Sequence, residues 1–527
     1  MVENLPTPIC LEKLDEMLVN YDQAKKQFLI NGFKEGFYLG YKGQANCNNK
    51  VPNLLSTENH EEAVAVYLDK EINKGRIAGP FMEIPFKHFQ LNPIGVVEKS
   101  VAGSFRIITN LSYPKGSSIN DNIPREFSQV SYSSIQDAAK LLLECGKNSY
   151  LAKCDIESAF RLIPLSPKQY HLLVYKWNNS FYHDKCLPMG ASSSCKIFEC
   201  FSSALEHIAK HNGIETMLHY LDDFLIVNPS EMGCQDDLNQ FVNMCQAINV
   251  PLAKNKTVGP TQTITFLGLE IDTKAEIIRL PKEKIKKCEE LLSHLLSIPK
   301  CTKRKLESVL GLLSFTCQVV LPGRAFLLHM YAALVNIRKP WYFIRLSHEI
   351  KSDLNVWLLF LKDHNGISFY RDQLFLSDNS IHIFSDAAKS EGFGAYLDNH
   401  WFAGGWPSDW WSQQTIVLLE FIPIFLAIQV WGAKLQNKYI ILHSDNEPLV
   451  HNINHQTSKE KLVRVLLRKL VLEMLTHNIM FQAVHVPGYV NVIADKLSRL
   501  QISSFKQLHP LADPLPTPIP SLPVLTL

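Results

Sequence analysis

The alternation of apolar and polar positions predicts a β-hairpin near residue 222. The apolar runs 220–221 and 224–227 flank the pair Asp222-Asp223, and both runs have the composition of short strands. We therefore expect the two aspartates on a tight turn. Adjacent carboxylates between apolar flanks are costly to ionise unless a cation neutralises them. The pattern thus indicates a cation site.

A strand further upstream supplies another carboxylate. Residues 150–154 form a strand-like run that ends at Asp155 and is followed by a turn into a helix. Two divalent cations held roughly 3.5–4 Å apart need shared oxygen ligands, and Asp155, Asp222 and Asp223 would provide them. An isolated Asp-Asp pair is more often a surface turn, so the additional carboxylate is what favours a catalytic interpretation.

The C-terminal third has a different order of elements. Three short strands come first, followed by an apolar helix, another strand and a final helix. Four of these elements carry one acidic residue each, in the order strand, helix, strand, helix: Asp386, Glu420, Asp445 and Asp495. Taken alone, each has a structural explanation, such as a helix N-cap for Asp445. Together they predict a second carboxylate site.

A basic segment separates the two carboxylate sets. From Lys274 to Lys305 the sequence has ten basic and four acidic residues. Its apolar residues recur at the spacing of one helix face: Ile285, Cys288, Leu291, Leu292 and Leu295. The pattern predicts an amphipathic helix whose basic face is either simply solvated or contacts a nucleic-acid backbone. A second helical stretch, 303–334, is interrupted at Pro322-Gly323.

Composition limits the class of protein. A chain of 527 residues with 46% hydrophobic content implies several domains. Its net charge is only +2, so any attraction to nucleic acid has to be local. The twelve cysteines include no Cys-x-x-Cys pair, which argues against a zinc ribbon or a thioredoxin-like motif.

The apolar segment 415–432 is too short for a membrane span and contains Glu420, Pro423 and Gln429, so we expect a core helix. The N-terminus has no signal-peptide pattern. We therefore expect an intracellular protein of the cytoplasm, the nucleus or both, with no membrane partner.

Four motifs, in this order and spacing, resemble the reverse transcriptases of retroelements: 154–160, 187–194, 219–223 and 266–270. The segments 93–99 and 104–111 look like the fingers of such enzymes. The residues of the segments 189–199 and 321–326 are most similar to those of DIRS-like retrotransposons, which encode a tyrosine recombinase. The resemblance runs from about Glu62 to Arg499. It implies a multidomain α+β protein, with a right-hand polymerase of fingers, palm and thumb followed by a ribonuclease H-like α/β domain.

The resemblance also implies roles for particular residues. Asp155, Asp222 and Asp223 would hold two Mg²⁺ ions, or Mn²⁺, while a primer 3′-hydroxyl attacks a dNTP on an RNA template. The same resemblance implies the residues of a nucleotide pocket. Lys99 and Arg106 would grip the triphosphate, Phe160 would exclude a 2′-hydroxyl, and Met189-Gly190 would pack near the nucleotide. The sequence departs from common patterns at Met189, where many relatives have Gln, and at Asn110, where related elements often have Asp.

The second carboxylate set resembles that of ribonuclease H, which cleaves RNA in an RNA–DNA hybrid with two Mg²⁺ ions. Asp386, Glu420, Asp445 and Asp495 would hold these ions. His485 would assist product release or proton transfer, because its ordinary pKa lies near working pH. Asn491 also matches the final segment of that family.

The expected organisation has five parts: a leader at 1–60 with a helix near 11–28, fingers and palm at 61–273, a helical thumb and connection at 274–374, a ribonuclease H-like domain at 375–500, and a Pro-rich tail at 501–527 that forms a disordered or extended linker end. No segment resembles a protease or a zinc knuckle, and nothing after Leu500 resembles a recombinase or an integrase, so a recombinase would be encoded separately or lost. The alternatives are a host-retained or decayed copy that binds RNA or hybrids without turnover, and an enzyme with one surviving activity.

Overall fold

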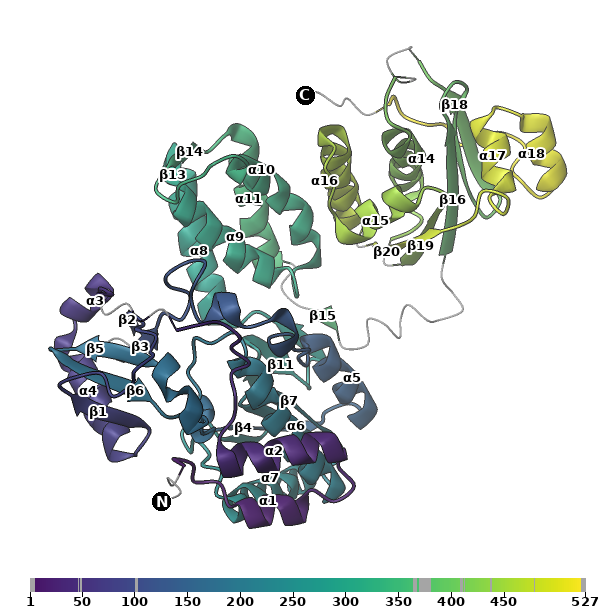
Figure 1. The fold of residues 1–527 in the computed structure, drawn as a ribbon. Helices are drawn as coiled ribbons and strands as arrows, with labels where there is room; N and C mark the ends of the chain where they lie inside the picture. The colour runs from purple at the N-terminus through teal and green to yellow at the C-terminus, as the bar shows by residue number, and fades with distance from the viewer. Residues whose placement is uncertain are drawn as a thin grey trace. The chain divides into compact units, whose positions relative to one another are not determined.

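The computed structural model describes residues 5–45, 47, 50–99, 103–363, 367–368, 381–407, 411, 413–436, 438–477 and 479–522 (Figure 1). The chain divides into two compact units. The first comprises Met1–Leu267 and Ile271–Glu276, and the second comprises Gly268–Glu270 and Ile277–Leu527. The boundary expected between residues 374 and 375 lies outside the described residues.

A four-stranded antiparallel sheet forms the centre of the first unit. Its order is β7-β8-β4-β9, with β4 at Tyr150–Asp155, β7 at Met217–Tyr220, β8 at Asp223–Asn228 and β9 at Val258–Thr261. Three helices pack on these strands: α5 (Ile135–Cys145), α6 (Ser194–His211) and α7 (Glu231–Ile248). The β8 residues 224–227 are fully buried, as expected for an apolar strand covered by helices.

A smaller layer of strands corresponds to the predicted fingers. One sheet has the order β1-β6-β5, from β1 (Ile77–Phe81), β6 (Ser180–Asp184) and β5 (Val174–Trp177), and β2 (Ile94–Glu98) pairs with β3 (Phe105–Thr109). Helix α4 (Glu61–Asn73) contacts β1 and β3. Shorter elements complete this unit: α3 (Leu55–Glu58), η1 (Asn120–Asn122), η2 (Arg125–Phe127), η3 (Ala159–Leu162), η4 (Pro167–Leu172) and β10 (Thr263–Phe266).

The leader forms two helices where the sequence analysis expected one, so that prediction was wrong in detail. Helix α1 spans Leu11–Met17 and α2 spans Gln23–Glu35. Between them, Asn20 has a φ of 53°, which a helix cannot accommodate. Asp22 then begins the second helix, because its side chain accepts a hydrogen bond from the backbone N–H of Lys25.

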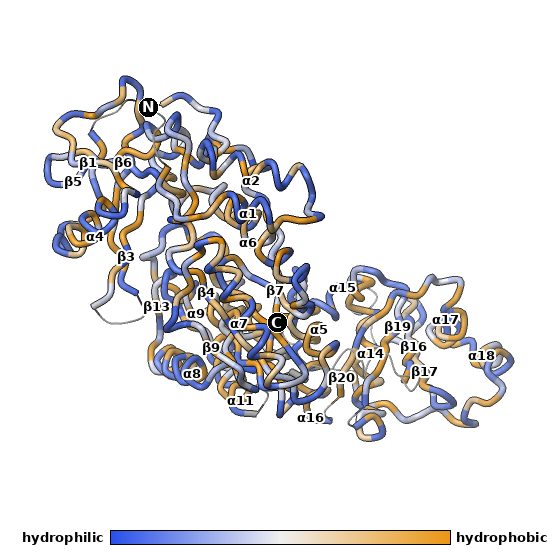
Figure 2. Tube along the Cα trace, turned by 90° about the horizontal axis from the view of Figure 1, so that it is seen from below, coloured by the Kyte–Doolittle hydropathy of each residue, from blue (hydrophilic) through white to orange (hydrophobic). Residues whose placement is uncertain are grey.

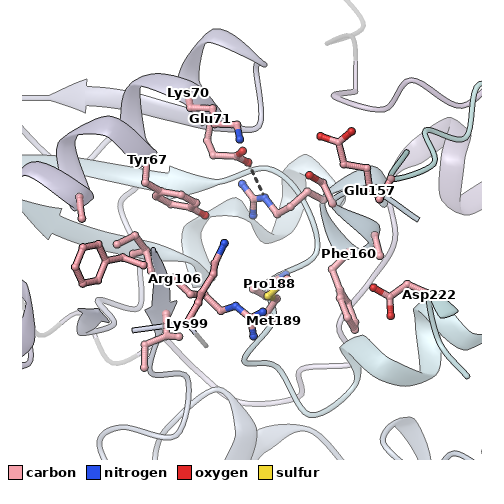
Figure 3. A pocket seen from close by; sticks show the side chains of 18 of the residues that line it. Tyr67, Lys70, Glu71, Lys99, Arg106, Glu157, Phe160, Pro188, Met189 and Asp222 are labelled. Carbon is pink, nitrogen blue, oxygen red and sulfur yellow. Dashed lines mark hydrogen bonds and ion pairs between the residues drawn. The ribbon is translucent and has the colours of Figure 1, made fainter. Parts of the chain in front are cut away.

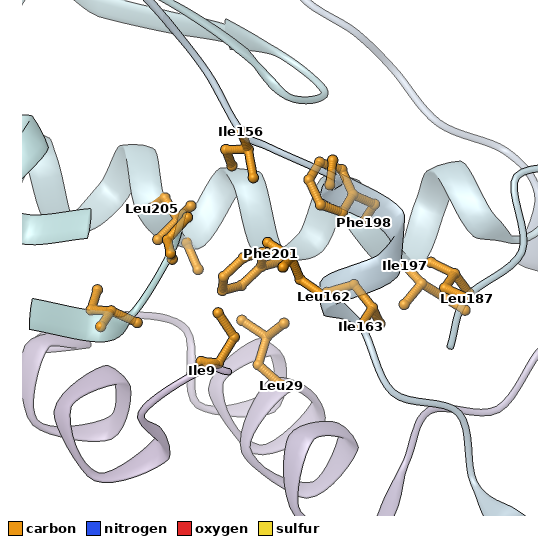
Figure 4. Close-up of a cluster of buried hydrophobic side chains, with 14 of the residues drawn as sticks. Ile9, Leu29, Ile156, Leu162, Ile163, Leu187, Ile197, Phe198, Phe201 and Leu205 are labelled. Carbon is orange, nitrogen blue, oxygen red and sulfur yellow. The ribbon is translucent and has the colours of Figure 1, made fainter. Parts of the chain in front are cut away.

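The leader is part of the polymerase core rather than a separate segment. Ile9 and Leu29 lie in the same buried cluster as Phe201 and Leu205 of α6 (Figure 4). The backbone N–H of Cys10 also donates to the carbonyl at the end of α7. Burial of these apolar side chains ties residues 9–39 to the sheet that carries the carboxylates.

The thumb region of the second unit is mostly helical, as predicted. It consists of α8 (Lys282–Ser297), α9 (Lys303–Thr316), η5 (Leu321–Leu327), α10 (Leu328–Leu334) and α11 (His348–Asp363), together with a ribbon of β13 (Lys300–Thr302) and β14 (Phe343–Arg345). In α8, Cys288, Leu292 and Leu295 are buried, which confirms the predicted apolar face. Strand β11 (Leu269–Asp272) lies at the boundary of the units, and β12 (Ile277–Arg279) pairs with β15 (Ile367–Ser368).

A five-stranded mixed sheet forms the core of the C-terminal region. Its order is β18-β17-β16-β19-β20. Strands β16 (Ile381–Ala388), β17 (Gly392–Leu397) and β18 (His400–Gly405) are antiparallel, whereas β19 (Tyr439–Ser444) and β20 (Met480–His485) run parallel to β16. The helices are α14 (Ile416–Trp431), α15 (Glu447–His455), α16 (Lys461–Thr476), α17 (Val492–Ser498) and α18 (Ile502–Leu508).

Helix α14 contacts β16 and β17 and is almost entirely buried, as its hydrophobic colouring in Figure 2 suggests. The apolar residues of α14 therefore form part of a hydrophobic core, as predicted. Among the helices of the described ranges, none has both the length and the apolar character needed to cross a bilayer.

The Pro-rich tail is extended beyond residue 508, which is one of the two expected forms, but it packs on the sheet rather than ending as a linker. Residues 502–508 form α18, and the extended segment beyond it lies along β18. The Trp401 indole donates to the carbonyl of Asp513 at 2.8 Å, and the Thr517 N–H donates to the carbonyl of Trp401 at 2.7 Å. Ile519 and Leu522 pack on the hydrophobic core of the C-terminal sheet. Prolines exclude a helix here, but the apolar residues between them bury well.

Candidate active sites

The polymerase carboxylates converge as the sequence predicts. Strand β4 ends at Asp155, which lies directly opposite Asp223 in the antiparallel pairing of β4 with β8. The turn between β7 and β8 consists of Leu221 and Asp222, and Leu221 adopts a φ of 53°. The Ile156 N–H donates to the carbonyl of Asp222 at 3.0 Å. The predicted hairpin is therefore confirmed, and it places the three acids at one end of the sheet.

The electrostatics of these acids favour a cation. Burial, and then the charge of Asp155, raise the pKa of Asp222. Burial raises the pKa of Asp223 to about 6, although Lys153 opposes the shift from 3.6 Å. The Oδ1 atom of Asp223 is buried without a hydrogen-bond partner. Both oxygens of Asp155 accept hydrogen bonds from the Lys256 ammonium at 2.9 Å.

A cavity of about 1620 Å³ opens beside these carboxylates. Asp155 and Asp222 line it, together with all the nucleotide-binding residues expected from the sequence: Lys99, Arg106, Phe160, Met189 and Gly190. Figure 3 shows Lys99, Arg106 and Met189 on one side of the cavity and Phe160 with Asp222 on the other. Asp223 does not line the cavity.

The β2–β3 hairpin positions the two cations of the pocket. Arg106 pairs with Val97 across the hairpin, and the Lys99 N–H donates to the carbonyl of Ser104 at 2.8 Å. The hairpin therefore brings a lysine and an arginine to the same cavity wall. A point charge and a planar fork of donors suit the oxygens of a polyphosphate.

Two positions of the cavity lining are fixed by close packing. The ring of Phe160 stacks at a tilt against Phe198 of α6, with centroids 5.1 Å apart. At Gly190, a Cβ atom would lie only 2.6 Å from the carbonyl oxygen of Thr109, so no other residue fits without a backbone shift. The neighbouring Met189 remains 55% exposed.

The sequence analysis missed a buried ionic network beside Phe160. The guanidinium of Arg161 donates to Glu71 at 2.9 Å and forms an ion pair with Asp184 at 2.7 Å. All three residues are less than 9% exposed. The network joins α4, η3 and β6, and its Arg161–Glu71 bond is drawn dashed in Figure 3. Only spatial proximity reveals it, because the partners lie far apart in sequence.

A second missed feature lies beneath the aspartate turn. The buried imidazole of His219, in β7, bonds to Glu206 through Nδ1 and to Glu199 through Nε2, the latter at 3.0 Å. Burial disfavours the imidazolium, but the hydrogen bonds to the two glutamates outweigh it and raise the pKa of His219 to about 9. Lys210 also donates to Glu206 at 2.6 Å.

In the C-terminal region, three predicted acids come together. Burial, and then the charge of Asp445, raise the pKa of Glu420 to about 8, although Ser444 and Asn446 donate to its oxygens at 2.8 and 3.3 Å. Burial raises the pKa of Asp386 to about 6 against the hydrogen bond from Ser498, with Asp445 and then Asp495 adding to the rise.

The other residues expected in this site are Asp495, His485 and Asn491, and each has its own contacts. Asp495 lies in the first turn of α17 and accepts from the Arg499 guanidinium at 2.7 Å. The ring of His485 is exposed, with Nε2 3.2 Å from the carbonyl of Asp445. Asn491 is 3% exposed and donates to the Ser385 carbonyl at 3.0 Å, whereas its Oδ1 is buried without a partner.

No three His, Cys, Asp or Glu side chains in the described ranges lie close enough to form a ready metal centre. The chemistry of the donors nevertheless fits a divalent cation. The unpaired Oδ1 of Asp223 and the Lys256 ammonium on Asp155 indicate that positive charge is favoured at the first site. The raised pKa of Glu420 indicates the same at the second.

Comparisons with known proteins agree with this arrangement. Residues 97–271 match the family described as Reverse transcriptase (RNA-dependent DNA polymerase). Protein P of a duck hepatitis B virus is 25% identical over 184 residues, which are 34% of this chain and 23% of that protein. An enzymatic polyprotein of Cassava vein mosaic virus is 22% identical over 374 residues, which are 67% of this chain and 53% of the viral one. The chain thus spans between about a quarter and a half of these relatives.

A solved structure supports the fold. The foamy viral protease-reverse transcriptase, solved in complex with double-stranded DNA, aligns with a TM-score of 0.52 and 14% identity, covering 90% of this chain and 81% of that one. The fold class expected from the sequence is confirmed. Residues 97–271 therefore match a reverse transcriptase domain, within a right-hand polymerase fold that is followed by a further α/β domain.

Proposed function

We propose that this chain is an RNA-directed DNA polymerase with ribonuclease H activity, encoded by a retrotransposon of the DIRS-like group. It copies element RNA into DNA and degrades the RNA strand of the resulting hybrid. The observation that carries the proposal is the pairing of Asp155 with Asp223 across two strands, beside a cavity that also holds Lys99 and Arg106.

The residues of the polymerase site have three roles: binding the triphosphate, excluding a 2′-hydroxyl and holding divalent cations. Lys99 and Arg106 bind and orient the triphosphate of a dNTP, while the ring of Phe160 occupies the space that a 2′-hydroxyl would need. Asp155, Asp222 and Asp223 would hold two Mg²⁺ ions, or Mn²⁺. When bound, these ions lower the pKa of the primer 3′-hydroxyl and stabilise the leaving pyrophosphate.

The nuclease residues have a parallel arrangement. Asp386, Glu420, Asp445 and Asp495 would hold a second pair of divalent cations. A bound cation favours the charged form of Glu420, whose pKa is otherwise raised to about 8 by burial and by Asp445. His485, exposed beside the Asp445 carbonyl, moves a proton or assists product release.

The proposed partners are an RNA template, a DNA primer, the RNA–DNA hybrid and dNTPs. A separately encoded recombinase would complete integration, and the protein would act in the cytoplasm, the nucleus or both.

Extension of a labelled DNA primer on an RNA template by the purified chain, with Mg²⁺ and dNTPs, tests the polymerase. Asp222→Asn should abolish extension and leave hybrid cleavage intact, whereas Asp445→Asn should do the reverse. Each variant is thus the control for the other. If both variants retained both activities, the two site assignments would be wrong. A folded wild-type chain that binds hybrid without extending the primer would contradict the polymerase proposal.

A further inference from the structure

An aromatic and basic surface in the thumb has no role in either carboxylate site. Trp341, Tyr342 and Phe343 are consecutive, and they are 63%, 46% and 62% exposed. Lysine side chains flank them: the Lys339 ammonium lies 5.5 Å from the Trp341 ring centroid, and that of Lys300 lies 4.9 Å from the Phe343 ring. We define the aromatic–basic patch as Lys300, Lys339, Trp341, Tyr342, Phe343 and Arg345.

The β13–β14 ribbon explains why these side chains are exposed. In register, Lys300 pairs with Arg345, Cys301 with Ile344 and Thr302 with Phe343. Cys301 and Ile344 are buried, so by strand alternation Phe343 and Arg345 point to the opposite, outer face. Figure 1 shows the ribbon at one end of the thumb helices.

The backbone of the patch is held in place. The N–H of Lys303 donates to the carbonyl of Tyr342 at 2.8 Å, and the N–H of Arg304 donates to that of Pro340 at 2.9 Å. The rings of Trp341 and Tyr342 stand at 88° to each other, with centroids 6.4 Å apart. The patch therefore offers stacking surfaces in different directions on a fixed scaffold.

The charge around the rings is of one sign. Residues 298–305 and 335–346 contain several Lys and Arg residues and no Asp or Glu. Within the part of the chain that the structure describes, Lys300, Lys339 and Arg345 form no ion pair with a carboxylate. A cluster of large exposed aromatic rings is unusual on a surface that contacts only solvent. Cations beside the rings favour an anionic ligand that also has flat apolar groups.

We propose that the aromatic–basic patch binds single-stranded nucleic acid. Unpaired bases stack on the rings of Trp341 and Phe343, while Lys300, Lys339 and Arg345 contact the phosphates. Exposed aromatics in a basic setting are how sequence-tolerant single-strand sites work, because every base has a flat face. A duplex keeps its bases stacked in its interior, so its phosphates can contact the Lys and Arg side chains but its bases cannot stack on the aromatic rings. The proposal requires neither catalytic activity.

Fluorescence anisotropy of the full-length chain with a labelled oligouridylate tests the proposal, without Mg²⁺ or dNTPs. Substituting Trp341→Ala together with Phe343→Ala should weaken oligouridylate binding about 5- to 150-fold for each stacked base lost. Affinity for an RNA–DNA hybrid of the same length should not change. Arg345→Gln should instead reduce the slope of log affinity against log salt by about 0.7.

Tyr331→Ala is the matched control, because Tyr331 is 44% exposed on α10 and lies outside the patch. This variant should bind oligouridylate like the wild type. Unchanged oligouridylate binding in the double variant would overturn the proposal. An equal loss for oligouridylate and hybrid would also overturn it, since the patch would then contribute only general charge or folding. Loss of self-association without loss of oligouridylate binding would point to a protein interface and refute it as well.

Discussion

Replacing His219 by Gln should remove a pH-dependent part of the stability of the polymerase unit. In the folded chain His219 lies between Glu199 and Glu206, and its pKa is raised from an ordinary value of 6.5 to about 9. A group whose pKa rises on folding stabilises the folded state below its unfolded pKa. That contribution disappears as the pH rises from 6.5 through 9.

The size of the effect follows from the shift. One pKa unit corresponds to about 1.4 kcal/mol. Between pH 6 and pH 9.5, protonation of His219 should therefore contribute and then lose about 3 kcal/mol. The side chain is only 7% exposed, so solvent does not screen the interaction appreciably. The wild type should be more stable than His219→Gln at pH 6 by about this much more than at pH 9.5.

Urea titrations at pH 6 and pH 9.5 measure this difference. After equilibration, a pulse of hydrogen exchange at one common pH, followed by mass spectrometry of the peptide covering 217–228, reports the unfolding of β7 and β8. His207→Gln is the control, because His207 contacts the Val19 carbonyl and forms no ion pair with a carboxylate among the residues that the structure describes. If the stability difference between the wild type and His219→Gln were the same at both pH values, the stabilising charge of His219 between Glu199 and Glu206 would be refuted.

Three further outcomes follow from the structure. Arg161→Met leaves Asp184 buried without this ion pair and leaves Glu71 with the longer ion pair to Arg76 at 3.8 Å, so the free energy of opening of β6 should fall by about 3–5 kcal/mol. Lys42→Ala, which breaks an exposed pair with Glu126, should cost about 1 kcal/mol or less. Hydrogen exchange of the β6 amides distinguishes the two variants, and equal losses would contradict the network. Ending the chain after His509 removes Ile519 and Leu522 from the hydrophobic core of the C-terminal sheet and should lower the unfolding free energy of that region by roughly 2–4 kcal/mol. Urea titration measures this loss, and an unchanged midpoint would mean that the tail is not docked. Because the pKa of Glu420 is raised from 4.5 to about 8, the stability of the wild type should fall as the pH rises between these values. Glu420→Gln should therefore unfold at a higher temperature than the wild type at pH 8 but not at pH 4.5, and Mg²⁺ should reduce the difference. A difference in unfolding temperature that does not depend on pH would refute the assignment.

The carboxylates were predictable because each sits where local sequence determines its position. Asp155 ends an apolar strand and Asp222 lies between two such strands, so strand and turn propensities alone bring them to one edge of a sheet. Gly190 is similar: its motif marks it, and the structure adds the reason, which is the Thr109 carbonyl.

What was missed depends on contacts between segments that are distant in sequence. Arg161 looks like an ordinary turn residue until α4 and β6 bring Glu71 and Asp184 to it. The pairing of His219 with α6 left no local signal beyond two glutamates spaced along that helix. The tail misled for another reason, because its prolines correctly exclude regular structure yet do not prevent Ile519 and Leu522 from being buried.

The docked tail has a consequence for the order of events during synthesis. β18 is the edge strand of the C-terminal sheet, and its His400 ring is hydrogen-bonded to the carboxylate of Asp513, 113 residues later. A ribosome that adds about 5–20 residues per second leaves that edge uncovered for roughly 6–23 s. An uncovered edge strand is a template for pairing with another chain. The nascent protein therefore passes through an interval in which neighbouring copies on one message can join through β18, and the arrival of the tail ends it.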